Sequence, residues 1–225
     1  MSAVENLRRV REAIGRAAAR AGRRADEVGL VAVTKGVPVE VIREVVAAGQ
    51  TVLGENRAQE LVAKHARVPG AEWHFVGSLQ TNKVRAVIDK VALVHSLDRW
   101  NLAVELDRRA QARGTVVPVL IQVNVSGEAA KRGVAPEELR AFARRVAGLP
   151  GLAVRGLMTI APLVRDPEEV RPLFQHLRDL ARRLEEEVPG VEMKYLSMGM
   201  SNDFEVAVEE GSTLVRVGTA IFGRK

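Results

Sequence analysis

Residues 29–54, GLVAVTKGVPVEVIREVVAAGQTVLG, contain the unit that the rest of the chain repeats. A β-branched run ends at Lys35, a stretch with helical period follows from Pro38 to Ala48, and another apolar run begins after Gly49. Short apolar runs of this kind predict buried strands, while proline near the start and glycine after the end are typical of a helix. The segment therefore predicts a strand, a helix and a second strand.

The same alternation continues along the chain. We expect strands at 29–35, 51–53, 73–76, 93–96, 116–125, 152–159, 193–196 and 213–217. We expect helices at 3–21, 38–48, 57–67, 81–89, 99–113, from Pro136 onward, at 167–187 and at 203–209. This order predicts the α/β class and a (β/α)8 TIM barrel, formed as a single domain over residues 1–225.

Two features refine the barrel prediction. Only residues 218–225 follow the last expected strand, so we expect the N-terminal helix to take the place of the last outer helix. A doubly wound open sheet is the alternative fold. It would usually have fewer strands and a glycine-rich first turn, which this sequence lacks.

The composition narrows the class of protein. The absence of cysteine excludes a disulfide framework, a thiolate metal site and a cysteine nucleophile. No apolar run reaches the roughly 18 residues that span a bilayer, and the cationic N-terminus lacks the apolar core of a secretory signal. We therefore expect a cytoplasmic protein that does not bind membranes.

The net charge of +6 raises the question of a nucleic-acid partner. The arginines stand beside Glu and Asp on expected helices, as on solvated helix faces, and aromatic residues make up only 4% of the chain. We therefore expect no nucleic-acid binding, and instead attraction of a small phosphorylated ligand.

Lys35 is the most informative single residue. Active sites of such barrels form at the carboxyl ends of the strands, and alternation places Lys35 on the same face as Val31 and Val33, toward the barrel interior. Partial burial there would disfavour the ammonium form, and the neutral amine could then attack a carbonyl carbon. The alternative is a lysine that merely extends to solvent at the end of a strand.

The loops after the last two strands predict a phosphate site. In SMGMSND (197–203) and VGTAIFG (217–223), Gly199 and Gly218 permit close backbone approach, and Ser201 and Thr219 offer hydroxyl groups. Barrels often bind phosphate between these two loops. The alternative is an ordinary helix cap and turn.

Arg216 should face the same side as Gly218, where a buried guanidinium needs an anion or another hydrogen-bond acceptor. His74, Asn56 and Asn124 could complete a polar ring around it. No metal site is expected, since the histidines at 65, 74, 95 and 176 lack ligand spacing and no paired carboxylate cluster occurs.

The sequence resembles the pyridoxal 5′-phosphate (PLP) homeostasis protein family, also called the YggS-like or proline synthase co-transcribed family. The resemblance covers nearly the whole chain. Its segments are VAVTK with Lys35, LGENRAQEL (53–61), HFVGSLQTNK (74–83), VNVSGEAAKRGV (123–134), GLMTIAP (156–162) and SMGMSNDFEVAVEEGSTLVRVGTAIFG (197–223). Many members carry a second lysine two places after the Schiff-base lysine, where this chain has Val37.

The resemblance implies a barrel like the N-terminal domain of alanine racemase, with PLP held by Lys35 as an internal aldimine. It implies cofactor contacts as follows: phosphate at Ser201, Gly218 and Thr219, pyridine nitrogen or phosphate at Arg216, and the remaining pocket at Asn56, Ser197 and Met198. It also implies a carrier or regulator of intracellular PLP (vitamin B6) without established catalysis, whose partners would be PLP and PLP-accepting apo-enzymes.

Two enzyme alternatives remain open from the residues. An amino-acid racemase would use the same cofactor but needs an acid/base on each face of the α-carbon, and this chain has one tyrosine, Tyr195, and no second domain. The missing second domain also leads us to expect a monomer. A Schiff-base aldolase without PLP would share the lysine and the phosphate site.

Overall fold

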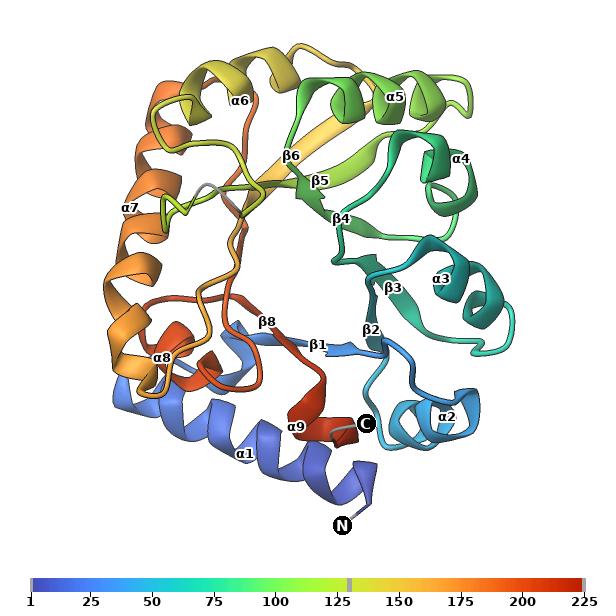
Figure 1. Ribbon diagram of the computed structural model, residues 1–225, viewed down its shortest axis with the longest axis vertical. Coiled ribbons are helices and arrows are strands. Elements are labelled where there is room, and N and C mark those ends of the chain that lie inside the picture. Colours follow the sequence, from blue (N-terminus) through green and yellow to red (C-terminus); the bar gives the residue numbers. More distant parts are fainter. Residues whose placement is uncertain (1, 129–130, 224–225) are drawn as a thin grey trace.

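The computed structural model describes residues 2–128 and 131–223, so Ala129 and Ala130 of the segment 123–134 lie outside the described residues. Eight parallel strands close into a barrel in chain order, with the last strand paired to the first (Figure 1). They are β1 (Gly29–Val33), β2 (Val52–Glu55), β3 (Glu72–Phe75), β4 (Leu93–Leu97), β5 (Val117–Gln122), β6 (Leu152–Met158), β7 (Tyr195–Ser197) and β8 (Leu214–Val217). The predicted (β/α)8 barrel is confirmed, and the open sheet is excluded.

Helices surround the barrel. They are α1 (Ala3–Arg20), α2 (Val39–Ala47), α3 (Ala58–His65), α4 (Val84–Val87), α5 (Trp100–Gln111), α6 (Leu139–Ala147), α7 (Arg171–Glu187), α8 (Phe204–Glu209) and α9 (Thr219–Phe222), with 3₁₀ turns at Ala25–Glu27, Thr81–Lys83 and Pro167–Val170. Three expectations are corrected: the helix at 81–89 is a 3₁₀ turn followed by one α-helical turn, the short helix α9 was not predicted, and the seventh strand begins at Tyr195. Its first residue, Tyr195, pairs with Gly156 of β6.

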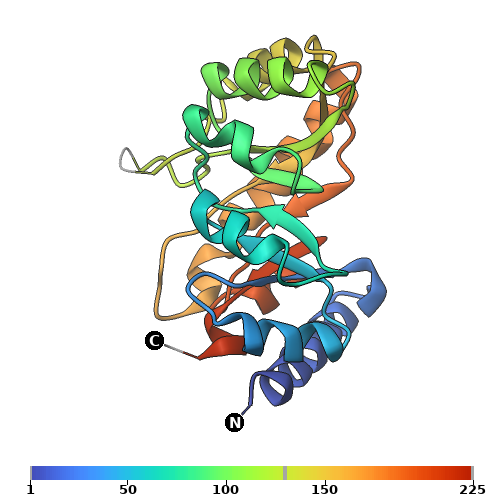
Figure 2. The ribbon, with the colours of Figure 1, turned by 90° about the vertical axis from the view of Figure 1, so that its right-hand side faces the viewer.

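Within the described residues, only the four-residue α9 follows β8, and helix α1 covers this side of the barrel (Figure 1). It lies beside α8 and α9, as Figures 1 and 2 show. Ser2 and Glu5 form a capping box at its start, and the Asn6 side chain donates a hydrogen bond to the Ile221 carbonyl oxygen at 3.0 Å. Its buried face consists of Leu7, Val10, Ala13, Ile14, Ala17 and Ala18. The prediction that the N-terminal helix replaces the last outer helix is confirmed.

The barrel interior combines a small apolar layer with a continuous polar chain. The apolar layer is formed by Val31, Leu93, Leu120, Met158 and Leu214. These side chains come from five different strands, so their packing links opposite walls of the barrel and contributes to its closure.

The polar chain runs from Arg216 to Glu72. The Arg216 guanidinium donates to Ser197 Oγ at 2.6 Å, and Ser197 Oγ lies 2.8 Å from His95 Nδ1. His95 Nε2 lies 3.0 Å from His74 Nδ1, and His74 Nε2 lies 3.0 Å from Glu72 Oε1. Because arginine can only donate and carboxylate can only accept, every member is satisfied when the protons all point toward Glu72. Both imidazoles are then neutral.

Burial holds these histidines in the neutral form. It lowers the pKa of His95 well below its usual value, and the neighbouring His74 and Arg216 act in the same direction. Burial also lowers the pKa of His74, although Glu72 opposes this shift. The folded protein therefore resists protonation at both rings.

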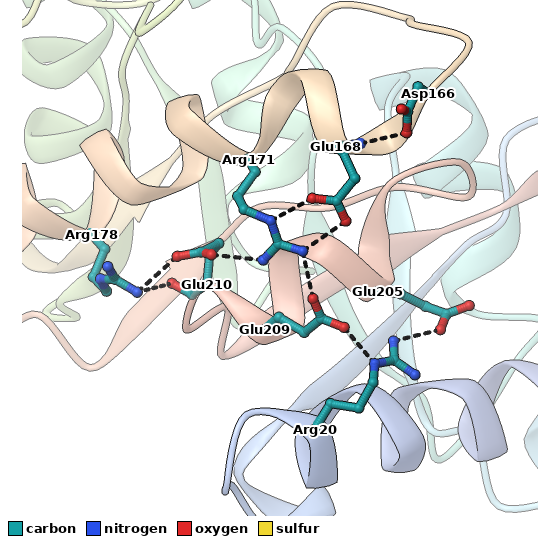
Figure 3. A network of polar contacts seen from close by, with 8 residues as sticks. All are labelled: Arg20, Asp166, Glu168, Arg171, Arg178, Glu205, Glu209 and Glu210. Carbon is teal, nitrogen blue, oxygen red and sulfur yellow. Dashed lines mark hydrogen bonds and ion pairs between the residues drawn. The ribbon is translucent and has the colours of Figure 1, made fainter.

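A surface network of ion pairs joins α7, α8 and α1 (Figure 3). Arg171 contacts Glu168 at 2.6 Å, Glu209 at 2.6 Å and Glu210 at 2.7 Å. Glu209 also pairs with Arg20 of α1 at 2.6 Å. Arg171 of α7 and Arg20 of α1 therefore share Glu209, which links the two helices by ion pairs.

We expect Arg171→Met to lower the free energy of unfolding by about 1–2 kcal/mol, because it leaves Glu209 and Glu210 together without their shared cation. Urea denaturation measures this change. Arg24→Met is the matched control, since Arg24 pairs with the exposed Asp26, and its loss should stay below about 0.5 kcal/mol. Equal losses in the two variants would contradict a special role for the network.

We expect the free energy of unfolding to fall as the pH drops below about 6.5. In that range His95 and His74 become protonated in the unfolded chain but stay neutral in the folded protein. One such group contributes a slope of at most about 1.4 kcal/mol per pH unit. Denaturation at a series of pH values should show a smaller slope for His95→Gln. His176→Gln is the control, because His176 is exposed. An unchanged slope in His95→Gln would show that another group is responsible.

Candidate functional site

A pocket of about 730 Å³ lies at the carboxyl ends of the strands. Six of the eight predicted site residues line it: Lys35, Asn56, Ser201, Arg216, Gly218 and Thr219. They come from the ends of β1, β2 and β8 and from the loop after β7. The fold therefore brings together residues from both ends of the sequence at the place where barrel active sites form.

Lys35 stands two residues beyond the end of β1 and lines the pocket between Val33 and Val37. The predicted face is therefore confirmed. The expectation of partial burial is wrong, because Lys35 is exposed. The physical reason is that β1 ends at Val33, so the lysine has already left the barrel interior when the chain turns through Gly36 (φ +64°).

The loop after β7 and the turn after β8 form the predicted phosphate side. Ser201 Oγ accepts a hydrogen bond from the Ala220 N–H at 3.1 Å, so its own O–H proton is left to donate to another acceptor. Thr219 is exposed at the pocket wall. A Cβ on Gly218 would lie 3.1 Å from the Val33 carbonyl oxygen, so glycine there allows β8 to end close against β1.

Asp203 holds the first of these loops. Its Oδ1 accepts from the Met200 N–H at 2.6 Å, and burial raises the pKa of this carboxyl. Gly199 has φ +92°, and a Cβ there would lie 2.6 Å from Ala207 Cβ. The loop is thus fixed by its own backbone contacts, with Ser201 at its tip.

Arg216 forms part of the pocket floor. Its guanidinium donates to Ser197 Oγ and, at 2.7 Å, to the Thr159 carbonyl oxygen. Within the described residues, no carboxylate lies within ion-pair distance of it. Burial lowers the pKa of Arg216 to about 10, and the Asp203 carboxylate acts in the opposite direction. A buried cation without a paired carboxylate favours a ligand that brings acceptor atoms or negative charge.

Asn56 provides a second unsatisfied group. Its Oδ1 is buried and has no hydrogen-bond partner among the described residues. A Cβ on Gly77 would lie 2.3 Å from the Asn56 carbonyl oxygen, so the glycine permits β3 to end tightly against this residue. A buried acceptor without a donor is costly, so Asn56, which lines the pocket, is a candidate for contact with a ligand.

Four predicted positions lie outside the lining of this pocket. Ser197 and Met198 are fully buried and do not line the pocket; Ser197 supports Arg216 from below instead. His74 belongs to the opposite end of the barrel, where it lines a pocket of about 400 Å³. The Asn124 side-chain amide donates a hydrogen bond within its own loop, to the Glu128 carbonyl oxygen at 3.0 Å. The polar ring is therefore reduced to Asn56 and Arg216.

Sequence reasoning missed the apolar wall of the pocket. It is formed by Val76, Ile160, Pro162, Leu163, Val164 and Phe222. Four of these belong to the loop after β6, whose apolar run IAPLV follows the strand without a helical period. That run was the available signal. Across residues 2–128 and 131–223, no helix has the length and apolarity to cross a membrane, and no group of three potential metal ligands occurs.

Comparison with known proteins agrees with this geometry. Residues 5–225 match the family model described as the alanine racemase N-terminal domain. A pyridoxal phosphate homeostasis protein of Aquifex aeolicus is 50% identical over 227 residues, covering 100% of this chain and 99% of that protein.

Solved structures show the same relationship. PipY of Synechococcus elongatus PCC7942, solved with PLP bound, has a TM-score of 0.86 and 38% identity, covering 99% of this chain and 100% of that one. Alanine racemase of Corynebacterium glutamicum shares the fold, with a TM-score of 0.73 and 19% identity, but this chain covers only 62% of it. The chain therefore belongs to the alanine racemase N-terminal domain family and, within it, to the pyridoxal phosphate homeostasis proteins.

Proposed function

We propose that this protein binds PLP at Lys35 and acts in PLP homeostasis as a carrier or regulator, without established catalysis. The observation that carries the proposal is the single pocket that holds an accessible lysine, an unpaired buried arginine and a hydroxyl-lined glycine turn. These groups suit an aldehyde, an aromatic ring nitrogen and a phosphate. The structure of PipY with PLP bound supports PLP as the ligand.

The residues fit the cofactor group by group. Ser201, Gly218 and Thr219 would hold the phosphate through a free hydroxyl proton, close backbone approach and an exposed hydroxyl. Arg216 and Asn56 would contact the ring. When bound, PLP supplies an aldehyde carbon that a lysine amine can attack and an electron-withdrawing ring. Since arginine has only donors, it would leave a facing ring nitrogen unprotonated and weaken that electron withdrawal.

The enzyme alternatives find less support. Racemisation needs an acid/base on each side of the α-carbon, and Tyr195 lines the pocket at the opposite end of the barrel. The alanine racemase likeness extends to the fold alone. A Schiff-base aldolase would need no PLP, whereas the relatives are named for it.

The proposal extends to partners and setting. Lys35 and Thr219 are exposed at the mouth, and Leu163 beside them is 83% exposed. An open mouth with an apolar rim suits delivery of PLP to apo-enzymes that require it. We propose that the protein does this as a cytoplasmic, single-domain monomer over residues 1–225.

We expect the purified protein with PLP to show a visible absorbance band and, after borohydride reduction, a covalent adduct on Lys35. Lys35→Ala should abolish the adduct and keep a cooperative melting transition, because the lysine is exposed and contributes little core volume. Peptide mapping and thermal melting measure both. A colourless protein that takes up no added PLP would defeat the proposal and favour the aldolase.

We expect Ser201→Ala or Thr219→Ala to weaken PLP retention by about 1–3 kcal/mol, roughly 5- to 150-fold in dissociation constant. Titration followed by absorbance measures this loss. Pyridoxal, which lacks the phosphate, is the control ligand and should bind the variants and the parent protein alike. PLP affinity unchanged in both variants would refute the phosphate assignment.

A further inference from the structure

A buried charged cluster lies beside the Lys35 segment and outside the pocket lining. Its centre is the Lys64 ammonium of α3, which donates to the Thr34 carbonyl oxygen at 2.7 Å, to Glu55 Oε1 at 2.5 Å and to Glu60 Oε2 at 2.8 Å. All three ammonium protons thus have acceptors. The Glu55 side chain is 0% exposed and the Lys64 side chain 8% exposed.

The cluster holds the backbone on both sides of Lys35. On one side, Thr34 is bonded through its carbonyl oxygen to Lys64 and through its hydroxyl to Glu55 at 2.7 Å. On the other side, the Gly36 N–H donates to Glu60 Oε2 at 2.6 Å. The residue that carries the reactive amine therefore lies between two clamped neighbours.

Simple stabilisation of the fold does not account well for this arrangement. The Thr34 N–H already pairs with the Gly54 carbonyl oxygen, so the end of β1 is held to β2 without the cluster. Burying the Lys64 ammonium with the Glu55 carboxylate costs desolvation energy, and an apolar pair of similar volume would often be neutral or stabilising. A cluster that bonds the residues before and after one exposed lysine serves the placement of that lysine.

We propose that Lys64, together with Glu55 and Glu60, positions Lys35 for covalent attack on the aldehyde of its ligand. The inference rests on the proposed function of Lys35. In that reaction a C=N bond replaces the C=O bond and the oxygen leaves as water. The cluster acts on the amine side, so it matters equally for aldehydes with and without a phosphate.

Stopped-flow absorbance on the full chain tests the proposal with PLP and with pyridoxal as probes. Lys64→Met should lower the limiting rate of covalent capture by roughly tenfold or more for both probes, with little change in the half-saturating concentration, because misplacement of a reacting group costs rate. Glu60→Gln, which keeps an acceptor for the Gly36 N–H, should slow capture less. Lys90→Met is the control, as Lys90 pairs with Asp89 at 2.8 Å on the surface.

Hydrogen exchange provides a readout that does not depend on PLP. Lys64→Met should speed exchange at the Gly36 amide while the amides of β5 stay protected, and Lys90→Met should change neither. Parent-like capture rates in Lys64→Met, slowing with PLP alone, or unchanged exchange at Gly36 would each overturn the proposal. Failure of the parent protein to capture either probe would instead count against the proposed function, and the exchange result would still decide whether the clamp exists.

Discussion

The pairing of β8 with β1 is the constraint on which the rest of this molecule depends. Val31 lies opposite Arg216 and Ala32 opposite Val217 in this register, so the two strands end at the same level. Lys35 and the turn at Gly218 consequently meet although they stand near opposite ends of the chain. Glycine at 218 favours the close approach, since a Cβ there would lie only 3.1 Å from the Val33 carbonyl oxygen.

The N-terminal helix α1 takes the place of a full outer helix after β8. In the part of the chain that the structure describes, β8 is followed by the four-residue α9 (Thr219–Phe222) and by no full outer helix. Helix α1 packs against α8 and α9. Arg20 at the end of α1 pairs with Glu209, which in turn pairs with Arg171 of α7. Thr219, the first residue of α9, is exposed at the pocket wall. The segment after β8 therefore both packs against α1 and lines the pocket.

The strands were predictable because apolar runs between glycine and proline breaks are a local property, and Lys35 and Arg216 followed from alternation along such runs. The support of Arg216 by Ser197 was not predictable in this way, because the seventh strand was expected to end at residue 196, whereas its pairing with β6 continues to Ser197. Lys64 lies on α3 together with Glu60, but its other partners, Thr34 and Glu55, lie on distant segments. Nothing in its neighbourhood along the sequence distinguishes a buried ammonium from a solvated one.

Two buried polar systems meet at the pocket from different directions. The chain from Glu72 fixes Arg216 from below, and the Lys64 cluster fixes the backbone of Lys35 from the side. Each of these systems buries polar groups where apolar packing would cost less free energy. The protein therefore gives up some stability for a rigid site. Yet Lys35 and Thr219 at the rim are exposed. Catalysis on a bound amino acid gains from excluding water, whereas capture and release of an aldehyde need access and a fixed amine. A rigid floor beneath an open mouth favours the carrier.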